Sequence, residues 1–218
     1  MTELEIKNLD FKYLDGVDKV LSDINMKLKS TDIVSIEGEN ASGKTTLLKI
    51  LAGILKIDRK KIYINKCEVG SREYKKNIAY IPANPIVFES LTGIEHMELI
   101  SDLWELKGKK KLEYRSKFFE YIKQFEIEKF IDEKVENYSL GTKYKLYFIC
   151  MISRSPKVLL MDEPLTSLDL KSQEKAITII KSLSQNMIII FSSHQSDIIE
   201  KISTKRYYIY KKNIIEKF

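Results

Sequence analysis

The sequence predicts an α/β fold with a mostly parallel sheet core, an N-terminal antiparallel β subdomain and an inserted helical subdomain. Three observations lead to this prediction. Apolar residues alternate with polar ones near the N-terminus, as in half-buried antiparallel strands. Short apolar runs at 158–161 and 187–191 are typical of buried parallel strands. The segment from 91 to about 138 has helical periodicity throughout.

The first part of the chain is expected to contain mostly strands. In chain order, these are predicted at 4–6, 9–13, 24–28, 33–36, 62–64 and 78–81. The apolar run at 33–36 leads directly into Gly38, and leucines on one stripe over 45–55 predict a helix there.

The remaining elements are expected to alternate between helices and strands, which favours a parallel sheet. Thr92 and Glu95 have the spacing of a capping box at the start of the helical segment. After it we expect a helix at 140–154, a strand at 158–161, a helix at 170–183, a strand at 187–191, a short helix, and strands at 207–210 and 213–215. We interpret residues 1–218 as one domain with a core lobe (1–90 and 155–218) and a helical lobe (about 91–154).

Composition is that of a globular protein, with 44% hydrophobic and 31% charged residues and a net charge of +6. The positive charge is expected on solvated faces, with attraction to nucleic acid or anionic lipid as the alternative. The densest run of lysines, 107–111, has no interleaved aromatics, so no nucleic-acid partner is expected. Cys67 and Cys150 lack metal spacing, which suits a reducing compartment. The sequence shows neither a signal peptide nor a membrane span, so a soluble chain is expected.

Residues 38–45 read Gly-Glu-Asn-Ala-Ser-Gly-Lys-Thr and match the pattern G-x-x-x-x-G-K-[ST] without a gap. In a P-loop NTPase the glycines let the backbone curl its N–H groups around a polyphosphate. Lys44 would reach the β- and γ-phosphates and Thr45 would ligate Mg²⁺. A chance glycine turn is the alternative, and the preceding strand and following helix argue against it. The candidate ATP-binding residues here are Gly38, Asn40, Ala41, Ser42, Gly43, Lys44, Thr45 and Thr46.

Two adjacent carboxylates, Asp162 and Glu163, follow the apolar run 158–161. We expect this strand to lie beside the strand that feeds the phosphate loop. Asp162 would then hold Mg²⁺, and Glu163 would polarise the attacking water as a general base. The alternative is that both acids only begin a turn before Pro164.

Residues 138–143, Tyr-Ser-Leu-Gly-Thr-Lys, lie just upstream of the acid pair. Ser139 is expected to cap a helix whose free N–H groups could face an anion, although an ordinary capped helix is the alternative. With these motifs in this order, the whole chain resembles the ATP-binding-cassette (ABC) ATPase family, the nucleotide-binding subunits of ABC transporters. The resemblance implies that Ser139 and Gly141 grip the γ-phosphate of ATP held by an opposite subunit.

The resemblance also assigns roles to residues outside these motifs. It implies that residues 167–169 line the subunit interface, and that His194 contacts the γ-phosphate and steadies Glu163. It implies that Tyr13 stacks on adenine, whereas a core position is the alternative reading of an aromatic on an alternating strand. His96 has no such context and is interpreted as structural. The candidate catalytic residues are Lys44, Glu163 and His194, and the candidate metal ligands are Thr45 and Asp162.

The chain departs from the family pattern after the predicted strand 78–81. Ala83 occupies the position of a glutamine that touches Mg²⁺ and water in the family, and an alanine side chain cannot do either. Asn84 is a possible substitute one position later. The motif at 138–143 also has Leu140 in place of glycine and Thr142 in place of glutamine. Slower or differently coupled hydrolysis is the hypothesis that follows.

The resemblance predicts an ATP-hydrolysing subunit that energises a separate transmembrane permease. It implies a head-to-tail dimer with a second cassette, either the same chain or a paralogue, and a groove near residues 82–88 for the permease. The motifs favour export of a peptide, drug or lipid-like cargo, at the inner face of a bacterial membrane, with the chain cytoplasmic and peripheral. The alternatives are a cassette acting on a cytosolic complex or nucleic acid, and a weakly catalytic regulatory cassette.

Overall fold

The computed structural model describes residues 1–14, 16–57 and 60–217. The chain forms two compact units. The first consists of residues 1–80, 156–164 and 179–218, and the second of residues 81–155 and 165–178. The assignment of all 218 residues to one domain with the lobe boundaries given above stays a prediction.

The first unit contains a four-stranded antiparallel sheet in the order β2-β1-β4-β5. Its strands are β1 (Glu3–Phe11), β2 (Leu21–Lys29), β4 (Ile62–Ile64) and β5 (Cys67–Glu68). The register of β1 and β2 shifts between Ile6 and Leu9, where Asn8 has a φ of 45°. This irregularity offsets the apolar alternation by one residue. The two stretches expected at 4–6 and 9–13 therefore form one strand that ends before Tyr13.

The second sheet of this unit has six strands in the order β10-β9-β3-β8-β7-β6. They are β3 (Ile33–Glu37), β6 (Ile78–Ile81), β7 (Val158–Met161), β8 (Ile188–Ser192), β9 (Lys205–Tyr210) and β10 (Asn213–Lys217). Strands β9, β3, β8 and β7 are parallel, and β10 is antiparallel to β9. Every residue of β3, β7 and β8 is buried, which explains the continuous apolar runs of β7 and of the first four residues of β8. The predicted fold class is confirmed.

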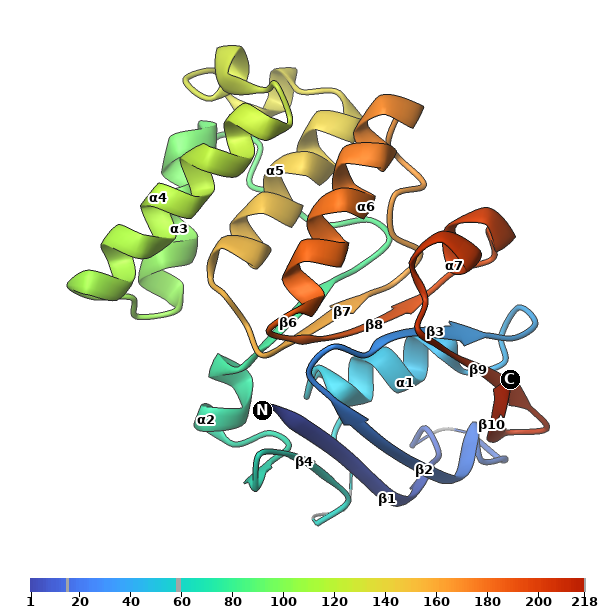
Figure 1. Cartoon of the computed structure of the whole chain (residues 1–218). Helices are drawn as coiled ribbons and strands as arrows, with labels where there is room; N and C mark the ends of the chain where they lie inside the picture. The colour runs from blue at the N-terminus through green and yellow to red at the C-terminus, as the bar shows by residue number, and fades with distance from the viewer. Residues whose placement is uncertain (15, 58–59, 218) are drawn as a thin grey trace. The chain divides into compact units, whose positions relative to one another are not determined.

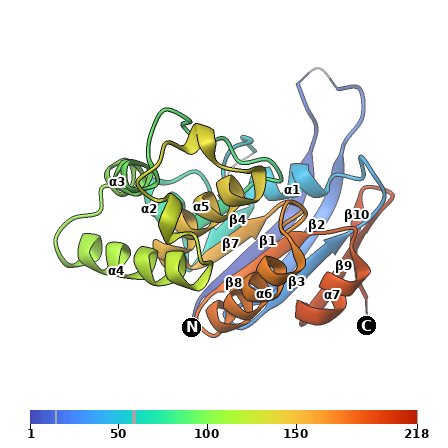
Figure 2. The ribbon, with the colours of Figure 1, turned by 90° about the horizontal axis from the view of Figure 1, so that it is seen from above.

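Helix α1 (Lys44–Leu51) lies between the two sheets of the first unit, and one hydrophobic core includes its leucines and strands of both sheets (Figure 1). The helix is shorter than the expected 45–55. It ends at Leu51 with Ala52 as its C-cap, because Gly53 has a φ of 69° and its N–H donates a hydrogen bond to the Ile50 carbonyl. The unit also contains α2 (Arg72–Lys76) and α7 (Ser196–Ile202). The described residues that connect β1 and β2 extend past the strands (Figure 2).

The second unit is helical, as expected. It contains α3 (Gly93–Leu103), α4 (Lys109–Gln124), two short 3₁₀ helices (Glu128–Phe130 and Val135–Asn137) and α5 (Leu140–Ser153). Helix α6 (Leu170–Ser184) begins in this unit and ends in the first. Both hydrogen bonds of the capping box form: the Thr92 N–H donates to the Glu95 carboxylate at 2.8 Å, and the Glu95 N–H donates to the Thr92 hydroxyl at 3.2 Å.

Large apolar side chains fill the interior of the helical unit. Tyr114 and Phe118 of α4 and Phe148 of α5 are almost fully buried. Cys150 is buried among them, as its apolar surroundings in the sequence indicate. Among the described residues, no helix has both the length and the apolar composition that crossing a membrane requires.

Candidate nucleotide-binding site

The predicted phosphate loop connects the buried strand β3 to the N-terminus of α1. Its backbone has left-handed residues where the chain curls: Gly43 has a φ of 110° and Ala41 a φ of 61°. A Cβ atom at Gly43 would lie 2.9 Å from the Leu21 side chain, so only glycine fits there. In the described part of the chain no side chain caps the N-terminus of α1. Its first N–H groups are thus available to an anion.

Lys44 reaches back into this loop. Its Nζ donates hydrogen bonds of 2.9 Å to the carbonyl oxygens of Gly38 and Glu39. Burial lowers the pKa of the Lys44 ammonium from its usual 10.5, while the charges of Glu163 and Asp162 act in the opposite direction. These two hydrogen-bond partners of Nζ are neutral carbonyls, so the positive charge of Lys44 lies against the backbone of the loop. This arrangement suits a polyphosphate.

The loop and the acid pair meet at Thr45. Its hydroxyl donates a hydrogen bond of 3.2 Å to Oδ1 of Asp162. A hydroxyl and a carboxylate are the oxygen ligands that Mg²⁺ takes beside substrate phosphates. Thr45 and Asp162 are therefore residues that could hold the expected ion.

One expectation about this region is wrong. Strand β7, which carries the acids, does not lie beside β3, because β8 pairs with both of them. Asp162 still reaches Thr45, because the carboxyl ends of parallel strands meet at one edge of the sheet. All three strands are fully buried and mostly apolar. Their pattern therefore cannot tell which of them is central.

The intervening strand brings a residue that the sequence interpretation missed. Ser192, at the end of β8, is fully buried, and its hydroxyl contacts both Asp162 and the backbone of Glu163. A signal was available, since Ser192 and Ser193 are polar residues that follow an apolar run and precede His194. Such a pair at the end of a buried strand indicates a hydrogen-bonding role.

Glu163 and His194 lie side by side. Nε2 of His194 is 3.3 Å from Oε1 of Glu163, and the His194 backbone N–H lies 3.3 Å from Oε2. Glu163 has a φ of 45°, which is unusual for a residue with a side chain. The predicted pairing of general base and histidine is present in the geometry, and their catalytic roles stay predictions.

The ring of Tyr13 lies next to the phosphate loop and is 42% exposed. Its hydroxyl is 3.0 Å from the hydroxyl of Thr46, and the edge of Phe11 meets the ring at 4.9 Å between centroids. These contacts leave a partly open aromatic face, which a purine base could stack on. In the loop itself Asn40 and Ala41 are exposed, whereas Ser42 is half-buried.

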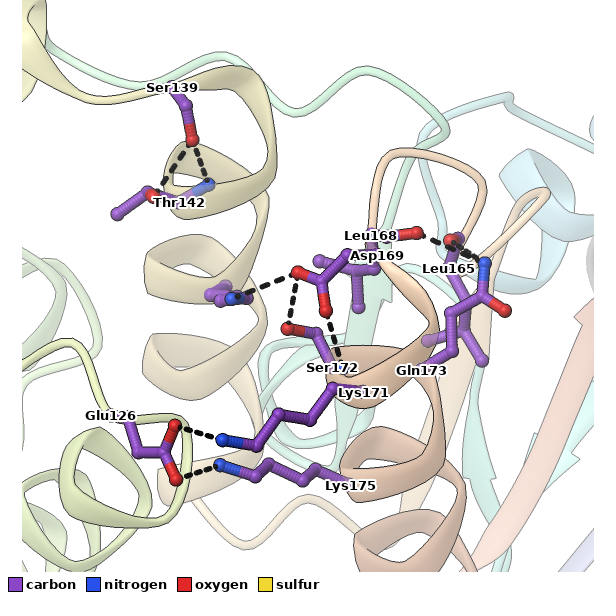
Figure 3. Close-up of polar contacts among 11 residues, drawn as sticks. Glu126, Ser139, Thr142, Leu165, Leu168, Asp169, Lys171, Ser172, Gln173 and Lys175 are labelled. Atoms are coloured by element: carbon purple, nitrogen blue, oxygen red, sulfur yellow. Dashed lines mark hydrogen bonds and ion pairs between the residues drawn. The ribbon is translucent and has the colours of Figure 1, made fainter.

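The remaining predicted contacts belong to the helical unit. Ser139 caps α5 by accepting a hydrogen bond from the Thr142 N–H at 3.2 Å (Figure 3). A Cβ atom added to Gly141 would lie 2.9 Å from the Ser167 carbonyl oxygen. The start of α5 is therefore packed directly on the backbone of residues 167–169.

Asp169 orders the end of that loop. Its carboxylate accepts hydrogen bonds from the N–H and the hydroxyl of Ser172, at 3.0 and 2.8 Å, in the first turn of α6 (Figure 3). The Lys145 ammonium of α5 lies 3.7 Å away. These contacts lower the pKa of Asp169, the hydrogen bonds from Ser172 most of all.

The predicted site residues are divided between the two units. The first unit contains Tyr13, the phosphate loop, Asp162, Glu163 and His194, and the second contains Ser139, Gly141 and residues 167–169.

A parallel sheet, a phosphate loop entering a helix and a carboxylate beside the loop define a P-loop nucleotide-binding protein. Residues 21–166, about two thirds of the chain, match the family model for the ABC transporter. The chain therefore belongs to the ABC transporter family, and it is the ATP-binding cassette, or ATPase, part of such a transporter, as predicted.

Relatives in sequence are named as transporters or as their ATP-binding proteins. The chain is 34% identical to ABC transporter A family member 11 of Dictyostelium discoideum, over 82% of this chain and 21% of the relative. It is 30% identical to a putative ABC transporter ATP-binding protein of Clostridium tetani, over 89% and 44%. It spans less than half the length of both. It is also 30% identical to the energy-coupling factor transporter ATP-binding protein of Aster yellows witches'-broom phytoplasma, over 91% and 72%.

Solved structures share the fold. An ATP-binding subunit of an ABC transporter matches with a TM-score of 0.89 and 24% identity, over 98% of this chain and 89% of that one. A dimeric ATP-binding cassette in a post-hydrolysis state, bound to ADP and Pi, matches with a TM-score of 0.85 and 23% identity, over 98% and 97%.

Proposed function

We propose that this chain binds Mg-ATP on the loop of residues 38–46 and hydrolyses it to drive a separate membrane subunit. The observation that carries the proposal is the contact of 3.2 Å between the Thr45 hydroxyl and the Asp162 carboxylate, one residue from Lys44. It places a magnesium-type donor pair beside a positively charged phosphate cradle.

Each candidate site residue of the first unit has a part in the proposed function. Lys44 and the loop N–H groups neutralise the phosphates, while Thr45 and Asp162 would hold the ion that shields their charge. Glu163 accepts a proton from the attacking water at its carboxylate. His194, 3.3 Å away, keeps that carboxylate oriented. Tyr13 holds the base.

The site is completed by a second cassette. Ser139 and Gly141 begin a helix whose N–H groups suit an anion, and they belong to a different unit from Lys44. A head-to-tail dimer would set the Ser139 helix of one chain against the ATP of the other. One structural neighbour is itself dimeric, which supports this arrangement by analogy.

The membrane partner is a separate permease, and this chain would be peripheral to it on the cytoplasmic side. Residues 82–88 are the proposed contact, and they expose Ile86 and Phe88. The motifs at 91–96 and 138–141 resemble those of exporters, so we extend the proposal to export of a peptide, drug or lipid-like cargo. Some relatives are named for import or for energy coupling, so the direction of transport needs its own test. Accumulation of cargo in inside-out vesicles supports export, and its absence with ATP turnover intact overturns that extension.

Nucleotide titration tests the central proposal. The chain should bind Mg-ATP, and Lys44→Ala should weaken binding by on the order of tenfold or more, because the loop loses its charge. Lys49→Ala, which removes a lysine from the same helix outside the motif, should bind like the unchanged protein. The absence of measurable Mg-ATP affinity in the unchanged chain would overturn the function altogether.

Restoring the glutamine tests the departure at position 83. If Ala83 slows or uncouples hydrolysis, Ala83→Gln should change the ATPase rate of the complete transporter, whereas Asn84→Ala reveals whether Asn84 substitutes for it. An unchanged rate and coupling in Ala83→Gln would discard the idea.

A further inference from the structure

The side chain of Ser192 joins the two acidic residues at the end of β7. Its Oγ donates a hydrogen bond of 2.6 Å to Oδ1 of Asp162 and accepts one of 2.9 Å from the backbone N–H of Glu163. Ser192 is 0% exposed, so both hydrogen bonds are shielded from bulk water. Strand β8 consists of four apolar residues followed by Ser192. The two hydrogen bonds satisfy the buried hydroxyl, which explains why a polar residue can end this apolar strand.

The first contact acts on the candidate metal ligand. Oδ1 of Asp162 receives the Ser192 hydroxyl at 2.6 Å and the Thr45 hydroxyl at 3.2 Å. A short hydrogen bond to an ionised carboxylate is among the stronger ones in proteins. It holds the Asp162 side chain in the orientation that meets Thr45.

The second contact acts on the candidate general base. Glu163 has a φ of 45°, a left-handed conformation that costs free energy in a residue with a side chain. The bond from its N–H to Ser192 fixes the backbone at that point. The turned backbone lets the carboxylate meet the Nε2 atom of His194.

We infer that Ser192 is a positioning residue, whose hydroxyl sets Asp162 for the magnesium ion and Glu163 for the attacking water. The inference rests on the proposed function and deepens it. It predicts that loss of the hydroxyl lowers the ATP affinity that depends on Mg²⁺. The ATP affinity that depends on Lys44 and the loop backbone should not change.

The test compares ATP affinity in excess Mg²⁺ with ATP affinity in EDTA, by calorimetry on the full chain. Ser192→Ala should reduce the gain in affinity from Mg²⁺ on the order of tenfold, as expected for a hydrogen bond to a charged group, and lower kcat. Its affinity without Mg²⁺ should stay within about twofold. Ser192→Thr retains the hydroxyl and should restore the Mg²⁺ dependence.

Ser193→Ala is the matched control. Ser193 is also buried, and its hydroxyl accepts a hydrogen bond of 3.0 Å from the Gln195 N–H. This variant should behave like the unchanged protein.

The outcomes separate the two claims. If the unchanged chain does not bind Mg-ATP, the proposed function fails. If it binds and Ser192→Ala keeps the full gain in affinity from Mg²⁺, the inference alone is overturned. An equal loss of affinity with and without Mg²⁺ also overturns the inference, because it shows that the role of Ser192 is purely structural. Should Ser192→Ala not fold, Ser192→Cys, of similar volume and weaker hydrogen bonding, is judged by the same comparison.

Discussion

The hydroxyl oxygens of Tyr13 and Thr46 lie 3.0 Å apart, which ties the exposed aromatic ring to the first turn of α1. Thr46 directly follows the candidate metal ligand Thr45. The proposed base contact and phosphate contact are thus linked through one hydrogen bond, although Tyr13 lies in the connection before β2. Substitutions of Tyr13 can therefore separate the contribution of its ring to ATP binding from the contribution of this hydrogen bond.

Removing the ring tests base stacking. Tyr13→Ala should lower ATP affinity about tenfold, because stacking on an aromatic ring contributes roughly 1–3 kcal/mol. Affinity for inorganic tripolyphosphate, which has no base, should not change. Tyr13→Phe keeps the ring and loses only the bond to Thr46, so its loss should be smaller. Equal losses for ATP and tripolyphosphate would show that Tyr13 only supports the loop.

Relieving backbone strain tests the loop conformation. Ala41 has a φ of 61°, and Ala41→Gly should raise the free energy of unfolding by roughly 0.5–1 kcal/mol, since a left-handed conformation costs a side-chain-bearing residue about 1–2 kcal/mol and glycine adds back some chain entropy. Ala52→Gly is the matched control: Ala52 has a φ of −71°, and this variant should be less stable. Urea unfolding measures both. A lower free energy of unfolding for Ala41→Gly would contradict the inference that the backbone at Ala41 is strained.

Adding one methyl group tests the packing of α5 on the loop of residues 167–169. Gly141→Ala places a Cβ 2.9 Å from the Ser167 carbonyl, and should lower the free energy of unfolding by roughly 1–3 kcal/mol. Leu140→Ala, at an exposed position in the same turn, should change it by about 0.5 kcal/mol or less. Chemical unfolding compares them, and a fully stable Gly141→Ala protein would rule out the close approach.

Neutralising the general base tests the two-cassette scheme. Glu163→Gln retains the shape of the side chain but cannot accept a proton, so the ATPase rate should fall by about 10²–10⁴. ATP should then persist and hold two chains together, giving a dimer by light scattering in Mg-ATP. Lys44→Ala combined with Glu163→Gln should remain monomeric. A monomeric Glu163→Gln protein at saturating ATP argues strongly against the scheme.

Acid titration tests an ion-pair cluster in the helical unit. Glu126 contacts the ammonium groups of Lys171 and Lys175, each at 2.8 Å, and these bonds lower its pKa from 4.5 to about 2 (Figure 3). A carboxyl with a lowered pKa adds stability that is complete above about pH 4.5 and is lost as the pH falls through 2. Because Glu126 is solvent-exposed, the effect should be small.

The expected result is a slightly lower melting temperature for Glu126→Gln at pH 7 and a smaller difference from the unchanged protein at pH 3. Glu128→Gln, an exposed neighbour outside the cluster, serves as the comparison. A melting-temperature difference that stays constant from pH 7 to pH 3 would show that the two lysines do not lower the pKa of Glu126.

Features that depend on a few neighbouring residues could be predicted from the sequence. The phosphate loop at 38–45, the Thr92–Glu95 capping box and the cap at Ser139 each rest on contacts within one turn of the chain. The buried strands could also be predicted, because continuous apolar runs have few other uses in a chain of this composition.

Sequence by itself determined where most of the strands and helices and the glycine-rich loop form, since backbone geometry and local capping act over a few residues. Only the tertiary structure decided that β8 lies between β3 and β7, that Ser192 joins Asp162 to Glu163, and that Gly141 packs on Ser167. Apolar runs of similar length are interchangeable in a pattern. Their order in a sheet follows from how all the side chains fill one core, and that is a property of the whole folded chain.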